Sequence, residues 1–231
     1  MRQTAEMAAP SDRGDAPPPP RLRAKRGREA VPTRERLLAS AKAEFAQHGF
    51  AGARVDRIVA KAGANSRMLY HHFGSKREIY VAVLEDALAD LRRHELKLDV
   101  DHADPLEGLL QLFDFMNDHF ESNQALVSLF RNENVLKARF MRTSPRIREM
   151  SSPVLTMIAR LIESGCTQGR LAENLDPLRI YVLMLALCQF HLSNMHTLSF
   201  IFDEDLSTTS WRAARKHDAR LMLKAFLRAA R

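Results

Sequence analysis

The segment RVDRIVAKAGANSRMLYHHFGSKREIY, residues 54–80, constrains the fold of this chain more than any other stretch. Apolar residues recur at helical spacing at positions 55, 58, 59 and 62, which predicts a short helix with one buried face. Gly63 predicts the end of this helix, because glycine enters a left-handed C-cap without a Cβ penalty. Asn65 is then a candidate N-cap for a second helix from Ser66 to about His72. Two short helices joined by such a turn predict a helix-turn-helix, whose second helix fits the major groove of DNA.

The residues after the turn carry a more specific pattern. Leu69 and Phe73 are four residues apart and are expected to face the core, and residues 75–78 have the sequence of a capping box. The chain contains Ala62-Gly63, then Leu69-Tyr70-His71-His72-Phe73, then Ser75-Lys76. On these residues the chain strongly resembles the TetR family of bacterial transcriptional regulators over positions 32–83.

The resemblance implies which residues meet DNA. By the family pattern, Ser66, Arg67 and Met68 face bases or nearby phosphates, while Tyr70, His71 and Lys76 hold backbone phosphates. Arg67 has the reach for a bidentate contact with guanine. The chain departs from the pattern at positions 65, 67 and 68, which indicates a target sequence of its own. The full predicted set is Thr33, Arg54, Asn65, Ser66, Arg67, Met68, Tyr70, His71 and Lys76.

The basic charge is concentrated around the same segment. Of a formal net charge of +7, residues 21–80 contribute about +9, from fourteen Lys and Arg against five Asp and Glu. Residues 1–20 and residues 81–231 contribute about −1 each. A solvated basic surface would explain such a surplus, but together with the motif it favours phosphate neutralisation.

The first 31 residues are predicted to be a disordered arm. Residues 16–20 are Ala-Pro-Pro-Pro-Pro without packing residues, and residues 21–28 form a basic run. The arm is equally consistent with a DNA-binding role, along the backbone or in a minor groove, and with a solubilising tail. Thr33 is then expected to cap a helix that runs to about His48 and ends at Gly49.

The rest of the chain has helical periodicity and no convincing strand, so the predicted fold class is all-α. Residues 32–80 form the predicted three-helix DNA-binding domain, and residues 81–231 a helical ligand-binding and dimerisation domain. Asp104-Pro105 and Asp176-Pro177 each predict a helix start, with proline at the first position. The expected helices after position 75 span about 76–96, from 105 to at least 120, 125–130, 135–141, 145–168 with a kink or break at Pro153, 177–202 and 210–230.

The helix predicted over residues 178–202 is nearly apolar all round, so it must be buried on more than one side. With the last helix it predicts a four-helix interface between two copies of the chain. The resemblance likewise implies a homodimer, a palindromic operator and an enclosed inducer pocket. Candidate pocket residues are polar groups in apolar helical faces and the apolar walls beside them: Phe113, Met116, Asn117, Phe120, Met157, Gln189, His191, Asn194 and Met195. Residue by residue, a purely structural role is the commoner explanation.

Other chemistry finds no support in the sequence. The chain has no HExxH, GxSxG, P-loop or GxGxxG motif, so no catalytic residue and no cofactor are predicted. Neither Cys188-x-x-His191 nor His71-His72 is a metal site by spacing alone, so none is expected. The longest apolar run, residues 180–188, falls short of the roughly 20 residues that span a bilayer. No signal peptide is recognised at the N-terminus, and a cytoplasmic location is expected.

These observations predict a homodimeric DNA-binding transcriptional regulator, a repressor released from its operator by an unknown small-molecule inducer. One alternative is a regulator without an inducer, either constitutive or controlled by a partner protein. A second is a small-molecule-binding or catalytic helical protein that keeps the DNA-binding domain as a relic.

Overall fold

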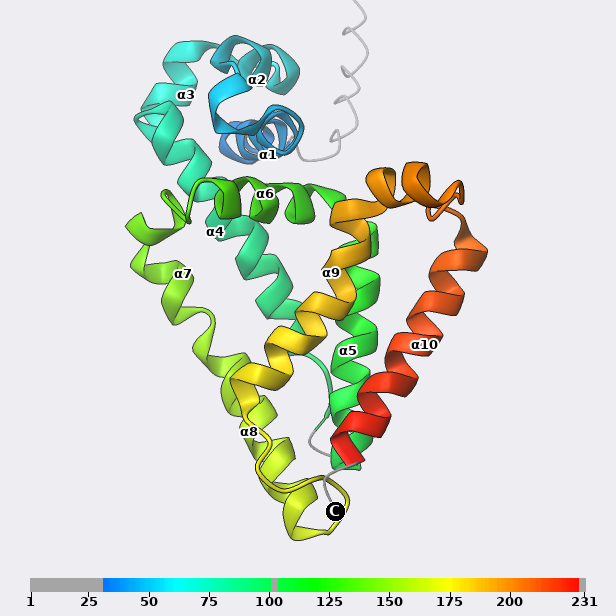
Figure 1. Cartoon of the computed structure of the whole chain (residues 1–231). Helices are drawn as coiled ribbons and strands as arrows, with labels where there is room; N and C mark the ends of the chain where they lie inside the picture. The colour runs from blue at the N-terminus through cyan, green and yellow to red at the C-terminus, as the bar shows by residue number, and fades with distance from the viewer. Residues whose placement is uncertain (1–30, 101–103, 229–231) are drawn as a thin grey trace, which may run out of the picture. The chain divides into compact units, whose positions relative to one another are not determined.

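The computed structural model describes residues 31–100 and 104–228, and within these ranges every regular element is a helix (Figure 1). The predicted all-α class is therefore confirmed. The predicted arm lies outside the described residues, except for Val31.

The first four helices are α1 (Thr33–Gly52), α2 (Val55–Ala62), α3 (Ser66–Phe73) and α4 (Lys76–Glu95). Helix α1 packs against each of the other three. Their shared core contains fully buried side chains from all four helices, namely Leu37, Phe45, Ile58, Leu69 and Ile79. The helix-turn-helix predicted from residues 54–80 is thus confirmed, with α3 as its second helix.

The start of α1 differs from the prediction. Thr33 is the first helical residue and caps nothing, because the Pro32 carbonyl already accepts the first helical hydrogen bonds, from the amides of Glu35 and Arg36. The Thr33 hydroxyl instead accepts a hydrogen bond from Arg36 at 3.3 Å. At the other end Gly49 leaves the helical conformation as predicted, with φ at 62°, and one further turn follows to Gly52.

The remaining helices are α5 (Pro105–Ser122), α6 (Gln124–Val135), α7 (Pro145–Glu149), α8 (Ser152–Thr167), α9 (Pro177–Phe202) and α10 (Thr209–Arg228), with a 3₁₀ turn, η1 (Met141–Thr143). Both predicted Asp-Pro starts are confirmed. Asp104 accepts a hydrogen bond from the Leu106 amide at 3.1 Å, and Asp176 accepts one from the Arg179 amide at 2.7 Å.

One predicted helix is absent, and another is broken near its proline as predicted. Residues 135–141 form no helix of their own, because Lys137 and Ala138 have φ values of 56° and 57°. The helix expected over residues 145–168 is divided into α7 and α8, as the proline allowed, and the break lies just before Pro153.

The predicted domain boundary at residues 80 and 81 falls inside α4 and stays a prediction. From Pro32 onward the chain forms one compact unit. Helix α6 packs against α1 on one side and α9 on the other. Helix α4 contacts α5, α6 and α7. Helices α1 and α4 are therefore in direct contact with the C-terminal helices, so a movement of those helices can reach α1 and α4.

Candidate DNA-binding surface and effector domain

Helix α3 is positioned by the turn that precedes it. Gly63 adopts the left-handed conformation (φ 59°, ψ 42°) and ends α2, and the Ala64 amide donates to the Val59 carbonyl at 2.9 Å. The Asn65 side chain then caps α3 by accepting a hydrogen bond from the Met68 amide at 2.9 Å. Leu69 is fully buried and anchors α3 to the core. The backbone and one buried face thus set the direction of the other face of α3.

The predicted DNA-contacting residues differ in how accessible they are. Arg54, Asn65, Arg67, Tyr70 and His71 are exposed, while Thr33, Ser66, Met68 and Lys76 are half-buried. Five of them, at positions 66, 67, 68, 70 and 71, come from α3 itself, and Asn65 precedes it. Their contacts with DNA stay predictions.

Lys76 is more constrained than an ordinary surface lysine. Its ammonium lies 4.9 Å from the centre of the Phe50 ring, which is a cation–π contact. Burial lowers the pKa of Lys76. A DNA phosphate at this position would therefore compete with the aromatic ring for the ammonium.

A buried carboxylate holds α2 on α1. Glu44 of α1 accepts hydrogen bonds from the Arg57 guanidinium at 2.8 Å and from the Arg54 amide at 2.9 Å. Burial raises the pKa of Glu44, but the hydrogen bonds from Arg57 and Arg54 outweigh it and hold the pKa below its ordinary value. Glu44 also gives the N-terminus of α2 a partner for its first amide.

Helix α4 connects this surface to the C-terminal helices. Ser75 caps it by accepting from the Glu78 amide at 3.1 Å, which confirms half of the predicted capping box. Its last turn carries Arg92 and Glu95, a buried ion pair. The Tyr181 hydroxyl of α9 accepts from Arg92 at 2.7 Å and donates to Glu95 at 3.2 Å. This network ties α4 to α9.

A second connection is aromatic. The rings of Phe45, Phe50, Tyr80 and Phe140 are packed with centroid distances of 4.2 to 6.3 Å. Phe140 belongs to the loop after α6, and the Glu133 carboxylate accepts its amide at 3.1 Å. Since Phe45 and Phe50 lie on α1 and Tyr80 on α4, a shift of this loop reaches both helices.

A groove of about 640 Å³ lies between α6 and α9. Two of the predicted ligand-binding residues, Gln189 and Asn194, line it together with Glu133. Glu133 was missed by the sequence analysis, although a carboxylate among the apolar residues of α6 was the available signal. The groove therefore borders the residue that holds the Phe140 loop.

A smaller hollow of about 340 Å³ lies between α9 and α10, and His191 lines it. His191 is buried, and its ring lies 6.2 Å from that of Trp211. Burial, then the positive charges of Arg215 and Arg212, lower the pKa of His191 to about 4. Its imidazole is therefore neutral at pH 7.

The other predicted ligand-binding residues line neither hollow. Phe113, Met116, Phe120 and Met157 are buried in the core, and Met195 is half-buried on α9. Asn117 is also buried, and its amide has protein partners, because it donates to Glu121 at 3.2 Å and accepts from Arg215. The nine residues thus do not converge on one cavity, and their role with a ligand stays a prediction.

Helices α9 and α10 expose an apolar surface. Its large side chains are Leu178, Val182, Leu183, Phe190, Phe200, Ile201, Phe202, Leu221, Met222 and Phe226. By length and composition α9 is the one described helix that meets the criterion for crossing a membrane, although the sequence analysis expected none. This is weak support for a membrane span, because core helices of soluble proteins meet the same criterion.

Comparison with known proteins covers both parts of the chain. The family model described as bacterial regulatory proteins, tetR family, matches residues 37–83. A second model, described as tetracyclin repressor-like, C-terminal domain, matches residues 105–222.

The HTH-type transcriptional repressor NicS of Pseudomonas putida is 32% identical over 188 residues, which cover 81% of this chain and 89% of NicS. The HTH-type transcriptional repressor SCO4008 of Streptomyces coelicolor is 41% identical over 95 residues, covering 41% of this chain and 47% of that protein. Among solved structures, SCO4942 of the same species has a TM-score of 0.63 at 27% identity and covers 83% of this chain and 98% of its own.

Proposed function

This chain belongs to the TetR family of bacterial regulatory proteins, and we propose that it is a homodimeric repressor released from its operator by a small-molecule inducer. TetR-family regulators bind operator DNA and act as dimers. The relatives named above are HTH-type transcriptional repressors. We infer that the chain works in the cytoplasm, where its operator is accessible, and that it has no enzymatic activity.

The main observation behind the proposed DNA binding is that α3 exposes one of its faces to solvent. Leu69 and the Asn65 cap hold the helix, while Arg67, Tyr70 and His71 are exposed. Arg67 is proposed to read a base, and Tyr70, His71 and Lys76 to hold phosphates. In a dimer, two copies of α3 would enter successive major grooves of a palindromic operator, about 34 Å apart.

The exposed apolar surface of α9 and α10 supports the dimer. Phe190 and Met222 from these two helices line the same hollow and are 63% and 65% exposed in the single chain. Large apolar side chains that gather on one surface mark a protein interface. Two such surfaces related by a twofold axis would form a four-helix contact.

The inducer part rests on the groove between α6 and α9. A ligand there would contact α6 beside Glu133, whose carboxylate holds the loop that ends at Phe140. The loop packs on the aromatic cluster of α1 and α4. A ligand that binds one position of α6 more tightly would therefore change the distance between the two α3 helices that the dimer most often adopts.

The DNA-binding part is tested with two variants and one control. A preferred duplex is selected from a random pool with the full chain, and its Kd and that of a scrambled duplex are measured by fluorescence anisotropy at fixed salt. Arg67→Ala is expected to weaken binding to the selected duplex by about 10- to 100-fold, because a bidentate base contact contributes roughly 1–3 kcal/mol of discrimination. Lys76→Ala should weaken both duplexes alike.

Arg228→Ala, which removes the same charge from the end of α10, is the matched control and should change neither Kd. Equal losses on the two duplexes for both α3-region variants would refute the proposed division of roles. A native chain that binds no duplex below micromolar Kd at moderate salt would favour the alternative of a relic DNA-binding domain.

The inducer is sought by thermal shift against a panel of small metabolites, with release of the selected duplex as the second readout. A compound that raises the melting temperature and releases DNA supports the proposal. Gln189→Ala, in the groove, should weaken its effect. A panel without any such compound would favour a constitutive or partner-controlled regulator.

A further inference from the structure

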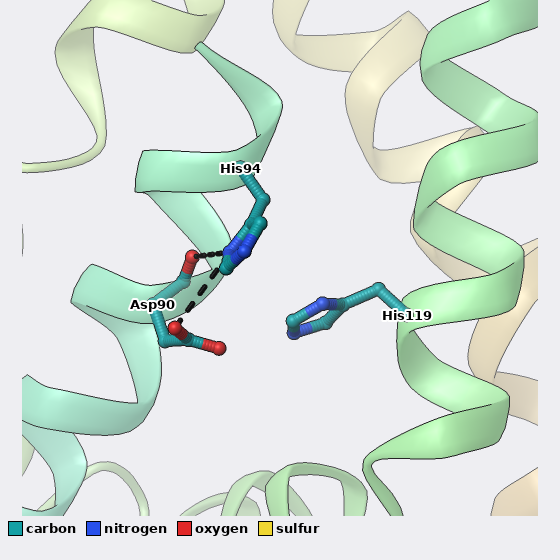
Figure 2. Close-up of side chains that lie close together, drawn as sticks. All are labelled: Asp90, His94 and His119. Atoms are coloured by element: carbon teal, nitrogen blue, oxygen red, sulfur yellow. Dashed lines mark hydrogen bonds and ion pairs between the residues drawn. The ribbon is translucent and has the colours of Figure 1, made fainter. Parts of the chain in front are cut away.

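Three side chains with metal-binding atoms meet where α4 and α5 lie side by side. Asp90 and His94 are one helical turn apart on α4, and His119 lies in the last turn of α5. Figure 2 shows the His119 ring pointing from α5 toward the two residues of α4. One ligand atom from each of the three lies within 4.8 Å of the other two. The cluster could not be recognised from sequence spacing, because His119 is 25 residues further along the chain than His94.

The hydrogen bond of His94 leaves one of its ring nitrogens available. Nδ1 lies 2.8 Å from the Asp90 backbone carbonyl, which accepts a proton but cannot donate one, so Nδ1 carries the hydrogen (Figure 2). The Nε2 atom of the neutral ring then keeps a lone pair. Histidines that bind metals are commonly oriented by such a second-shell bond to a backbone carbonyl.

His119 is buried and has no protein partner for its ring among the described residues. It is 9% exposed, and within residues 31–100 and 104–228 no group hydrogen-bonds to either ring nitrogen. The ring packs against Phe115 at 5.4 Å and Phe120 at 6.2 Å between centroids. Because no described protein group is hydrogen-bonded to the His119 ring, a ring nitrogen can face a ligand between the two helices.

The competing contacts of the cluster are weak. The Asp90 carboxylate is 3.0 Å from Arg93, in an ion pair between side chains that are 33% and 54% exposed. Exposed ion pairs of this kind contribute little to stability, so a divalent cation displaces the arginine easily.

We propose that Asp90, His94 and His119 bind a divalent first-row transition-metal ion of the class of Zn²⁺, Co²⁺ and Ni²⁺. Two imidazoles and one carboxylate are the ligands that such ions select, and three protein ligands leave a position open for water. At ligand distances of about 2.0–2.2 Å, donor atoms on a tetrahedral ion are about 3.4 Å apart. The cluster therefore closes by about 1–1.5 Å, which side-chain rotation of the exposed His94 accommodates.

The site is separate from the α3 surface and from the groove between α6 and α9, and it does not depend on the proposed function. Its occupant would join the end of α4 to the end of α5. Mg²⁺, which prefers oxygen ligands in octahedral geometry, should not compete.

The test uses the full chain without an affinity tag, freed of metal with a chelator. Zn²⁺ is titrated by calorimetry and Co²⁺ by its visible absorption, with Mg²⁺ in excess. The native chain is expected to bind one ion per protomer with low-micromolar or tighter affinity. His94→Gln and Asp90→Asn should each weaken metal binding by at least about 10- to 100-fold. Loss of a residue that merely orients a metal ligand already lowers the affinity by this factor.

His48→Gln is the matched control, because His48 also lies one turn from a carboxylate, 3.8 Å from Glu44, without a third ligand in the cluster. It should keep the native affinity. His94 is exposed, so His94→Gln keeps the fold, as circular dichroism verifies, and its result decides the test even if a variant of buried His119 unfolds. Equal Zn²⁺ affinity of the native chain and His94→Gln, or no binding by the native chain, would overturn the proposal.

Discussion

Replacement of Phe190 by alanine tests whether α9 and α10 form the dimer interface. Phe190 lies midway along α9, lines the hollows on both sides of this helix and is 63% exposed in the single chain. If a second copy of the chain covers α9 and α10, the Phe190 ring of each protomer is buried in the interface. The variant removes the ring without adding charge or changing the helical backbone.

The magnitude follows from the exposed area. A phenylalanine side chain buries about 200 Å² in full, so about 125 Å² of Phe190 is available to the partner, and truncation to alanine removes roughly 100 Å² of it. At about 25 cal/mol per Å², the loss is roughly 2.5 kcal/mol per protomer and, by twofold symmetry, about 5 kcal/mol per dimer. Because interface area does not convert fully into affinity, the dimer Kd should rise by at least about tenfold and by at most a factor of about 4,000, the equivalent of about 5 kcal/mol.

Sedimentation equilibrium over a range of protein concentrations measures this Kd. Val135→Ala is the control, because Val135 is 78% exposed at the end of α6 and is not one of the side chains of α9 and α10. It should leave the Kd unchanged. If Phe190→Ala and Val135→Ala have the same Kd as the native chain, the dimer forms through another surface.

Three further predictions concern stability, each measured by urea unfolding at one protomer concentration. Asn65→Ala should lower the free energy of unfolding by about 1 kcal/mol through loss of the α3 cap, whereas Asn65→Ser keeps a cap; equal midpoints for the two would contradict this role. Tyr181→Phe should cost about 1–3 kcal/mol, because it takes a partner from a buried ion pair, while the exposed Tyr70→Phe should change little; comparable effects would rule out the buried network as the cause. For His191, burial and then the charge of Arg215 lower the pKa to about 4, so the folded chain binds fewer protons than the unfolded chain. Stability should therefore fall as the pH decreases from about 6.5 toward 4, and His191→Gln should reduce this slope; an unchanged slope would exclude His191 as its source.

Local signals explain why the DNA-binding part was predictable from the sequence. The end of α2 depends on the conformation of Gly63, and the start of α3 on a hydrogen bond between residues three positions apart. The Asp-Pro starts of α5 and α9 are equally local. Where a local signal had a competitor, the prediction was wrong: Thr33 is a good capping residue, but the carbonyl of Pro32 already begins the helix.

The ligand-binding residues were less predictable for a physical reason. A polar residue on an apolar helical face needs a partner, but the sequence does not say whether that partner is a protein group or a ligand. Asn117 is paired with Glu121 and Arg215 in the core. Gln189 and Asn194 line a groove, although the Asn194 amide also donates to the Phe190 carbonyl at 2.8 Å. Polar residues on apolar helical faces thus have different surroundings in the folded chain, although their sequence patterns are alike.

The sequence by itself determined the all-α class, the helix-turn-helix and the orientation of α3, because periodicity, glycine conformation and capping act over a few residues. Only the tertiary structure decided which distant side chains meet. It joins Arg92 to Tyr181, Glu133 to the Phe140 loop, and His119 to Asp90 and His94. These contacts depend on how whole helices pack against one another, and many packings are compatible with the same amphipathic pattern.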